Sequence, residues 1–146
     1  MSDAEPIHDS PTGWVADHIR RYVATDGQDG HVWQGKKTLL LTTRGRKSGK
    51  LYRTALIYGM DNEHYVVVAS RGGHSQHPAW YHNLVADPAV QVQVAAERFK
   101  AQAASASGAE RERLWALMVA LWPTYQSFQN KTKREIPVVV LTREAE

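Results

Sequence analysis

Residues 44–53 bring together five cationic side chains, two glycines and a serine between two runs that read as β-strands. A hairpin turn needs about one glycine and no particular charge. Cations crowded on a flexible backbone repel one another unless an anion lies among them. The segment is therefore a candidate binding site for a phosphate or for carboxylates, with a solvated basic turn as the alternative when it is taken alone.

A second glycine-rich corner and a group of aromatic residues would suit the rest of such a ligand. Ser70-Arg71-Gly72-Gly73 follows a predicted strand and again includes a cation. The aromatic residues near strand and helix ends are Trp80, Tyr81, Trp122, Tyr125 and Phe128. Planar cofactors stack on aromatic side chains, and their anionic tails bind Arg and Lys. The combination is typical of a redox-cofactor site, in which the cofactor carries the reaction and the protein positions it.

Other chemistries lack the residues that they need. A phosphate-binding P-loop has four residues between its glycines and opens a helix, whereas three residues separate Gly45 from Gly49 and a predicted strand follows. The chain has no Rossmann fingerprint, no Gly-x-Ser-x-Gly elbow and no pair of carboxylates suited to hydrolysis. His74, His77 and His82 follow no familiar metal-ligand spacing, so we expect surface or pocket-lining histidines and no metal.

The composition of the 146-residue chain fits a single globular domain. Its net charge of +3 is modest for a nucleic-acid-binding protein and is concentrated in residues 44–53, so no nucleic-acid partner is expected. The absence of cysteine excludes disulfides and thiolate chemistry and permits a reducing compartment. We find no signal peptide and no run of about 20 apolar residues, which predicts a cytoplasmic protein.

Residues 1–13 are polar and proline-bearing and predict a flexible tail, whereas residues 14–146 are predicted to form one domain. Apolar residues recur at helical spacing over residues 14–25, which predicts an amphipathic helix. We expect this helix to dock on the core. The alternatives are that it covers the binding site or touches a membrane surface, which would make the protein peripherally membrane-associated.

The remaining pattern predicts six strands, at residues 38–43, 51–60, 64–69, 90–94, 98–105 and 136–142. A short helix is predicted over residues 79–84, and a longer one begins at a capping box, Ser107-x-x-Glu110, and ends at Pro123. Strands and helices do not alternate as βαβ units. We therefore predict a mainly β, α+β fold, a small closed or split barrel of mostly antiparallel strands with helices outside.

Four blocks of sequence, in order, resemble the deazaflavin-dependent nitroreductase family, whose members use coenzyme F-420. They are residues 40–50, residues 67–73, residues 78–84 with Asp87-Pro88, and residues 123–126 with 136–139. The resemblance implies a split β-barrel of the flavin mononucleotide (FMN)-binding type found in pyridoxamine oxidases. It also implies hydride transfer from reduced F-420 to an electron-poor small molecule, such as a quinone, an activated enone or lactone, or a nitroaromatic. FMN is the alternative cofactor.

The same resemblance implies roles for individual residues. Arg46, Lys47 and Ser48 should bind the phosphate and γ-glutamyl tail of F-420, with Gly49 and Lys50 completing the turn. Three further groups should line the cofactor: Tyr52, Arg53, Thr54, Ala55, Leu56 and Ile57; Val68, Ala69, Ser70, Arg71 and Gly72; and Ala79, Trp80, Tyr81, His82 and Asn83. The acceptor pocket should comprise Trp80, Trp122, Tyr125 and Phe128. Ser70 and Tyr125 are the implied catalytic residues, Ser70 stabilising charge on the ring and Tyr125 donating a proton to the acceptor or orienting it.

Several points stay open at this level. Either Tyr52 or Arg53 could reach the cofactor, and the proton could come from Tyr125 or from solvent. Trp122 and Phe128 stand where some family members carry tyrosines, which favours flatter and less polar acceptors. The alternative function is a non-catalytic carrier of deazaflavin, FMN or haem, and the chain could be a monomer or a homodimer.

Overall fold

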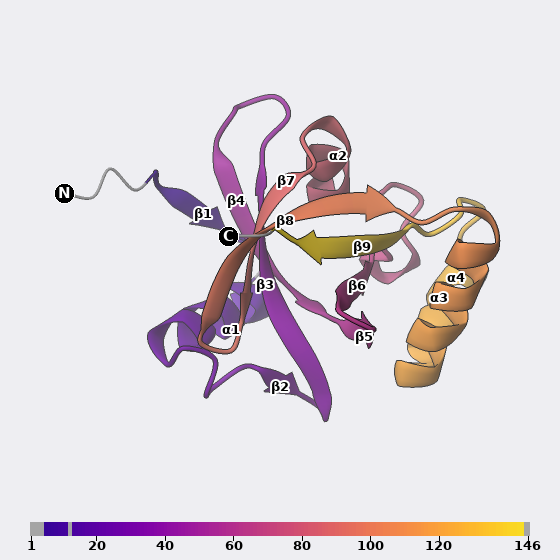
Figure 1. Cartoon of the computed structure of the whole chain (residues 1–146), viewed down its shortest axis with the longest axis horizontal. Helices are drawn as coiled ribbons and strands as arrows, with labels where there is room; N and C mark the ends of the chain where they lie inside the picture. Colours follow the sequence, from indigo (N-terminus) through magenta and orange to yellow (C-terminus); the bar gives the residue numbers. More distant parts are fainter. Residues whose placement is uncertain (1–4, 12, 145–146) are drawn as a thin grey trace.

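The computed structural model describes residues 5–11 and 13–144. Over these residues the chain forms one nine-stranded sheet flanked by helices (Figure 1). The strands are β1 (Ile7–Asp9), β2 (Val32–Trp33), β3 (Lys36–Arg44), β4 (Leu51–Ile57), β5 (Gly59–Asp61), β6 (His64–Val68), β7 (Ala89–Val94), β8 (Glu97–Ser105) and β9 (Val138–Arg143). The helices are α1 (Gly13–Ala24), α2 (Ala79–Ala86), α3 (Gly108–Leu121) and α4 (Thr124–Asn130), with a 3-10 turn η1 (Arg71–Gly73).

The sheet is a barrel that stays open along one side. Its strand order is β1-β4-β3-β7-β8-β9-β6-β5, with β2 paired to β3, and the order does not close on itself. Every pairing is antiparallel except that of β1 with β4. Strands β4 and β6 approach each other without hydrogen-bonding. The mainly β class and the mostly antiparallel order are confirmed, but the predicted number of six strands is wrong.

One additional strand arises because residues 51–60, predicted as a single strand, change partner at the buried Tyr58. Up to Ile57 the chain pairs with β3, and from Gly59 it pairs with β6. The two halves of the barrel therefore share one continuous segment. A close contact accompanies this change, since a Cβ on Gly59 would lie 2.7 Å from the sulfur of Met118 in α3.

The other two additional strands lie where no strand was predicted. Residues 7–9, placed in the tail by the sequence, form β1 on the edge of β4, whereas residues 1–4 and 12 lie outside the described residues. The short β2 extends the end of β3. Helix α4 also had no counterpart in the prediction, which recognised only the aromatic spacing of its segment.

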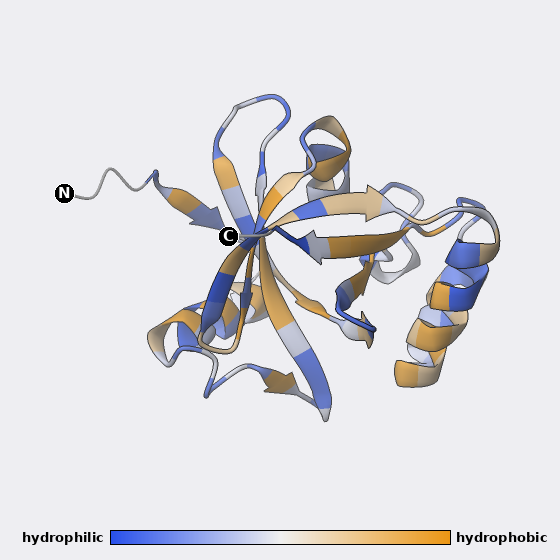
Figure 2. Cartoon of the chain, viewed as in Figure 1, coloured by the Kyte–Doolittle hydropathy of each residue, from blue (hydrophilic) through white to orange (hydrophobic). Residues whose placement is uncertain are grey.

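The described residues form three apolar clusters, of which the smallest lies under α1 and the other two are larger. One lies inside the barrel and includes Leu39, Leu41, Val92 and Val139. The other joins α3 and α4 to β6 and β9 and includes Leu114 and Met118. Figure 2 shows β9 coloured hydrophobic over most of its length, as expected for a strand that is covered on both sides.

The amphipathic helix α1 docks on the barrel, as predicted. Ile19 and Tyr22 are fully buried and pack against Leu40 of β3. The Tyr22 hydroxyl donates to the Thr38 carbonyl (3.0 Å) and accepts from the Ala95 amide (2.7 Å). One side chain thus joins the helix to β3 and to the turn between β7 and β8.

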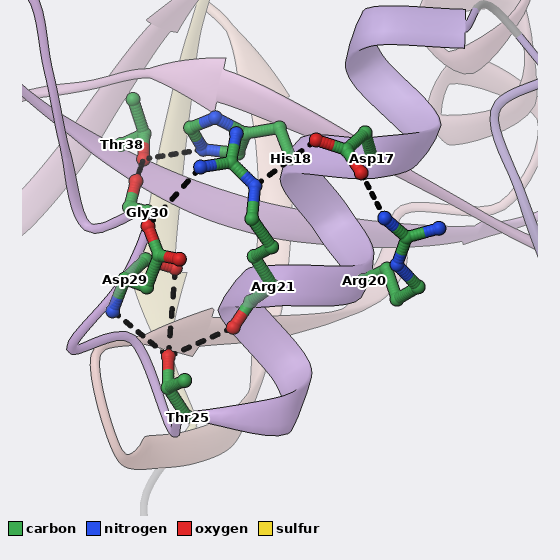
Figure 3. A network of polar contacts seen from close by, with 8 residues as sticks. All are labelled: Asp17, His18, Arg20, Arg21, Thr25, Asp29, Gly30 and Thr38. Carbon is green, nitrogen blue, oxygen red and sulfur yellow. Dashed lines mark hydrogen bonds and ion pairs between the residues drawn. The ribbon is translucent and has the colours of Figure 1, made fainter.

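A polar network joins α1 to β3 and to the loop that follows the helix (Figure 3). The Thr38 hydroxyl donates to the Gly30 carbonyl (2.6 Å), so its oxygen is free to accept from Nε2 of the buried His18 (3.4 Å). Arg21 bridges the carboxylates of Asp17 (3.1 Å) and Asp29 (3.2 Å). None of the helices among the described residues is long and apolar enough to cross a membrane.

Candidate active site

A cavity of about 1190 Å³ lies where α1, α2 and α4 meet the basic turn, β4 and the Ser70 corner. Most of the side chains that the sequence singled out line it: Arg46, Lys47, Ser48, Tyr52, Arg53, Thr54, Ala55, Leu56, Ile57, Val68, Ser70, Arg71, Gly72, Ala79, Trp80, His82, Asn83, Trp122, Tyr125 and Phe128. Segments far apart in the sequence therefore converge on one space. This convergence is what a cofactor site requires.

Four of the predicted residues do not line the cavity. Gly49 and Lys50 are exposed and do not contribute to the cavity lining, and Ala69 is fully buried. The Tyr81 hydroxyl instead shares a hydrogen bond of 2.9 Å with Ser105 at the end of β8. These four residues support the walls of the site without facing its interior.

Close packing shapes the basic turn. The Gly45 amide donates to the Lys50 carbonyl (2.7 Å), and the Gly49 amide donates to the Gly45 carbonyl (2.9 Å). Gly49 adopts a φ of +73°, which favours glycine. A Cβ on Gly45 would lie 2.6 Å from the ring of Tyr52, whose hydroxyl is 3.0 Å from the Ser48 hydroxyl. The local structure of the turn therefore explains both glycines, Gly45 by its close packing and Gly49 by its backbone conformation.

The five cations of the turn fall into two groups. Arg44 forms a two-pronged ion pair with Glu5 (2.7 and 2.9 Å), and Arg53 forms one with Asp9 (2.6 and 3.1 Å). The side chains of Arg46, Lys47 and Lys50 make no hydrogen bond or ion pair with any residue that the structure describes. The side chains of Arg46, Lys47 and Lys50 are thus open to an external anion, and anion binding by Arg46 and Lys47 stays a prediction.

Asn83 connects the basic turn to α2. Its side chain is buried, accepts from the Arg46 amide (3.1 Å) and donates to the Thr43 hydroxyl (3.2 Å). In Figure 1 the β3–β4 loop accordingly stands near α2. Asn83, predicted only as a wall of the site, thus also positions the backbone of the basic turn.

The Ser70 corner has an unusual backbone. Arg71 adopts a φ of +46°, which side chains other than glycine rarely adopt, and Gly72 and Gly73 follow at +61° and +82°. A Cβ on Gly73 would lie 2.7 Å from the Phe128 carbonyl of α4. The corner is therefore pressed against the helix that carries Tyr125.

Arg134 holds this corner in place, and sequence reasoning missed it. Its guanidinium donates to the carbonyls of Ala69 (3.2 Å), Ser70 (2.6 Å) and His74 (2.8 Å). Burial, and then the charge of Arg71, lower the pKa of Arg134. An arginine 64 residues away from Ser70 leaves no local signal in the sequence that could have found this contact.

Aromatic rings form a continuous wall of the cavity. Trp122 meets Tyr125 edge-on at 5.0 Å between ring centroids and Phe128 at 5.7 Å. Trp33 meets Trp122 at 6.2 Å and stacks on Trp14 at 5.9 Å. Trp14 and Trp33 were not predicted as site residues, since their proximity depends on the docking of α1 beside β2.

Tyr125 is buried in this wall, and burial raises the pKa of its hydroxyl far above the ordinary value. Its hydroxyl makes no hydrogen bond to another described residue. Such a group keeps its proton and can donate a hydrogen bond, but it is a weak acid.

The open barrel and its cavity, with unpaired cations and an aromatic wall, define a split-barrel protein that binds a large, planar, anionic cofactor. The family model for F-420H(2)-dependent quinone reductases matches residues 14–143, and the chain belongs to this family. Membership confirms the predicted class, an oxidoreductase with coenzyme F-420 as cofactor and a small-molecule acceptor.

Individual relatives agree with this assignment. The chain is 39% identical over 130 residues to an F-420H(2)-dependent quinone reductase of Mycobacterium tuberculosis, covering 86% of this chain and 87% of that one. A solved structure described as a domain-swapped dimer is 40% identical, with a TM-score of 0.70, over 90% of this chain and 99% of that chain. A solved F-420-H2-dependent reductase is 41% identical, with a TM-score of 0.66, over 71% and 92%. Solved structures below 25% identity share the split-barrel fold alone.

Proposed function

We propose that this protein reduces a quinone with hydride from reduced F-420, holding the cofactor tail at the basic turn and its ring at the Ser70 corner. The observation that carries the proposal is that Arg46 and Lys47, which have no acidic partner among the described residues, line the same cavity as the Ser70 corner and the aromatic wall. A phosphate with carboxylates behind it would compensate these charges. A flat ring fits among the aromatic side chains.

The chain divides the binding work among three segments. Arg46, Lys47 and the Ser48 hydroxyl bind the anionic tail, and Lys50 adds charge from outside the cavity. Thr54 and Leu56 of β4 and the α2 residues Ala79 and Trp80 line the ring. When bound, F-420 supplies the hydride.

The packing around Tyr52 and Arg53 favours Tyr52 as the tail contact. The Tyr52 hydroxyl already joins Ser48 in the turn, whereas Arg53 is paired with Asp9. Arg53 would then act on the cofactor only if Asp9 released it.

The acceptor occupies the space bounded by Trp80, Trp122, Tyr125 and Phe128. Tyr125 donates a hydrogen bond to an acceptor oxygen and so orients the quinone, and solvent delivers the proton. The hydroxyl of Tyr125 is the polar group of a wall that otherwise consists of Trp and Phe rings, which suits a flat, apolar quinone.

The assignment of the basic turn is tested by replacing Arg46 and Lys47 with glutamine. We expect the dissociation constant of F-420 to rise by about ten- to a hundredfold, since each charged hydrogen bond contributes roughly 1.5–3 kcal/mol and part of this is screened. Affinity should also depend less on salt. Titration of F-420 fluorescence at several ionic strengths measures both effects.

Lys100→Gln is the control for that experiment, because Lys100 is an exposed cation of β8 that does not line the cavity. It removes one positive charge from the whole molecule, whereas the double variant removes two, so it is the control for each single replacement. Equal affinity of wild type and the double variant would exclude Arg46 and Lys47 as the anchor. Tight F-420 binding with no turnover on any quinone would instead favour a carrier function.

We also propose a peripheral membrane contact beside the cavity, through which an apolar quinone could enter. It is supported by Trp14 and Val32, which are 63% and 61% exposed, next to Trp33 at the end of the aromatic wall. Exposed tryptophan suits the interface between water and lipid. The apolar face of α1 is buried against β3, so this contact would use only the first turn of the helix. A cytoplasmic location stays a prediction.

A further inference from the structure

His77 faces the cavity from the segment between the Ser70 corner and α2, and the reaction described so far gives it no role. Its Nδ1 lies 3.0 Å from Nη1 of Arg134. A guanidinium has only donors, so Nδ1 must accept this hydrogen bond and carries no proton. The neutral imidazole therefore has its proton on Nε2.

The surroundings of His77 also favour the neutral ring. Burial, followed by the charges of Arg134 and His82, lowers the pKa of His77. The ring packs against Tyr81 at 4.8 Å and His82 at 5.5 Å between centroids. Nε2 makes no hydrogen bond to any residue within 5–11 and 13–144, so its proton is available to a molecule in the cavity.

Arg134 places His77 beside Ser70. One of its terminal nitrogens contacts His77 Nδ1 and the Ala69 carbonyl, and the other contacts the Ser70 carbonyl. Because a guanidinium is planar and rigid, His77 and the corner are held in a fixed relation. A ligand ring that meets Ser70 therefore lies close to His77 as well.

We propose that His77 donates its Nε2 proton in a hydrogen bond to a carbonyl oxygen of the deazaflavin ring, and that Arg134 is the positioning residue that orients it. This inference rests on the proposed placement of the ring at the Ser70 corner. It adds a cofactor-binding residue to the site and explains why a half-buried arginine contacts both the corner and the histidine.

Two substitutions test the roles of the two ring nitrogens of His77 separately. His77→Asn keeps an acceptor at the position of Nδ1 for Arg134 but removes the donor that faces the cavity. His77→Gln keeps a donor at the position of Nε2 but removes the acceptor for Arg134. We expect His77→Asn to weaken F-420 binding by roughly five- to tenfold, the range for one neutral hydrogen bond. His77→Gln keeps the donor but loses its orientation by Arg134, so its affinity should fall less than that of His77→Asn, by about two- to threefold.

Binding is measured by F-420 fluorescence without any acceptor present. If His77→Gln bound F-420 weakly and His77→Asn bound it normally, His77 would only be a structural acceptor for Arg134, which would overturn the proposal. Unchanged F-420 affinity in both variants would also overturn it. An effect confined to the KM for quinone would move the contact to the acceptor and likewise overturn it. If the wild-type protein does not bind F-420, the proposed function is wrong. If the wild-type protein binds F-420 and His77→Asn binds it equally well, only the inference about His77 is wrong.

A second measurement needs no cofactor. In the ligand-free protein at neutral pH, the 15N shifts of His77 should show a bare Nδ1 and a protonated Nε2. In the Arg134→Met variant, His77 should no longer prefer the tautomer with its proton on Nε2, because no guanidinium donates a hydrogen bond to Nδ1. A doubly protonated ring or a proton on Nδ1 in wild-type protein would overturn the proposal.

Discussion

Tyr125 combines a buried position with a hydroxyl that has no partner among the described residues. Burial is the cause of its raised pKa, so ionising it inside the aromatic wall is unfavourable. A residue of this kind contributes to a reaction mainly through the hydrogen bond that it donates. Tyr52 also lines the cavity, but its hydroxyl contacts the Ser48 hydroxyl in the basic turn.

Tyr125→Phe should therefore lower kcat/KM for quinone by about tenfold, the magnitude of one hydrogen bond to the acceptor. The dissociation constant of F-420 should change by less than about twofold. Steady-state kinetics together with fluorescence titration give both quantities. Equal losses in the two would identify Tyr125 as a packing residue.

Tyr52→Phe is the matched variant for this comparison. It also removes one hydroxyl, but from the turn that holds the anionic tail. F-420 affinity should fall while turnover at saturating cofactor stays near that of wild type. The opposite outcome would exchange the proposed roles of the two tyrosines.

At the scale of elements, α1 belongs both to the core and to the site. Ile19 and Tyr22 bury its inner face, whereas Trp14, Val15 and His18 line the cavity. The sequence predicted the helix and its docking from apolar spacing. Contact with the site was offered only as an alternative, because it depends on where the barrel places the first turn of the helix.

The proposed membrane contact is tested on this element. Trp14→Ala and Val32→Ser should each reduce the fraction of protein that sediments with phosphatidylcholine vesicles, with or without phosphatidylglycerol, by about twofold or more. Val85→Ser is the control, because Val85 of α2 is 60% exposed and does not line the cavity. A wild-type protein that stays in the supernatant would contradict the proposal.

The prediction of elements succeeded where local patterns decide the structure. Alternating and continuous apolar runs located β3, β6, β7, β8 and β9, and the glycines of the basic turn indicated the β3–β4 hairpin. The change of partner at Tyr58 was missed because β4 and β5 form one unbroken pattern. Helix α4 was missed because residues 124–130 are rich in aromatic, Ser, Thr and Asn residues, which are modest helix formers, and tertiary packing overrides their propensity.

At the scale of the whole molecule, buried and half-buried histidines in separate parts of the fold make the stability depend on pH. Burial is the first cause of the lowered pKa of His18, His31 and His77. His18 contacts Thr38 through Nε2, and His31 lies 3.1 Å from the Tyr58 hydroxyl. The folded protein therefore binds protons at these sites less readily than the unfolded chain.

The free energy of unfolding should accordingly be highest above about pH 6.5, the ordinary histidine pKa, and should fall as the pH drops toward 5. The sign follows because the unfolded chain takes up protons in this range while the folded protein takes up fewer. Urea unfolding at pH 8, 7, 6 and 5 measures the slope. His18→Gln should flatten it, and a pH-independent stability between 8 and 5 would contradict the prediction.

The candidate site was predicted best where one segment carries its own signal. Arg46, Lys47 and Ser48 in the turn and Ser70 and Arg71 in the corner line the cavity, as do Trp80, Trp122 and Tyr125. Trp14, Trp33 and Arg134 reach the site from distant segments, so only the folded chain reveals them. The role of each residue toward the cofactor stays a prediction.

Strand β1 has a practical consequence for work with the purified protein. Glu5 and Asp9, just before and at the end of this strand, carry the carboxylates that pair with Arg44 and Arg53 of the basic segment. An affinity tag fused ahead of residue 5 would place foreign charges beside the segment that is meant to hold the cofactor tail. The last strand, β9, contributes no residue to the cavity lining. Purification tags are therefore better placed at that end of the chain, or removed, before affinities are compared between variants.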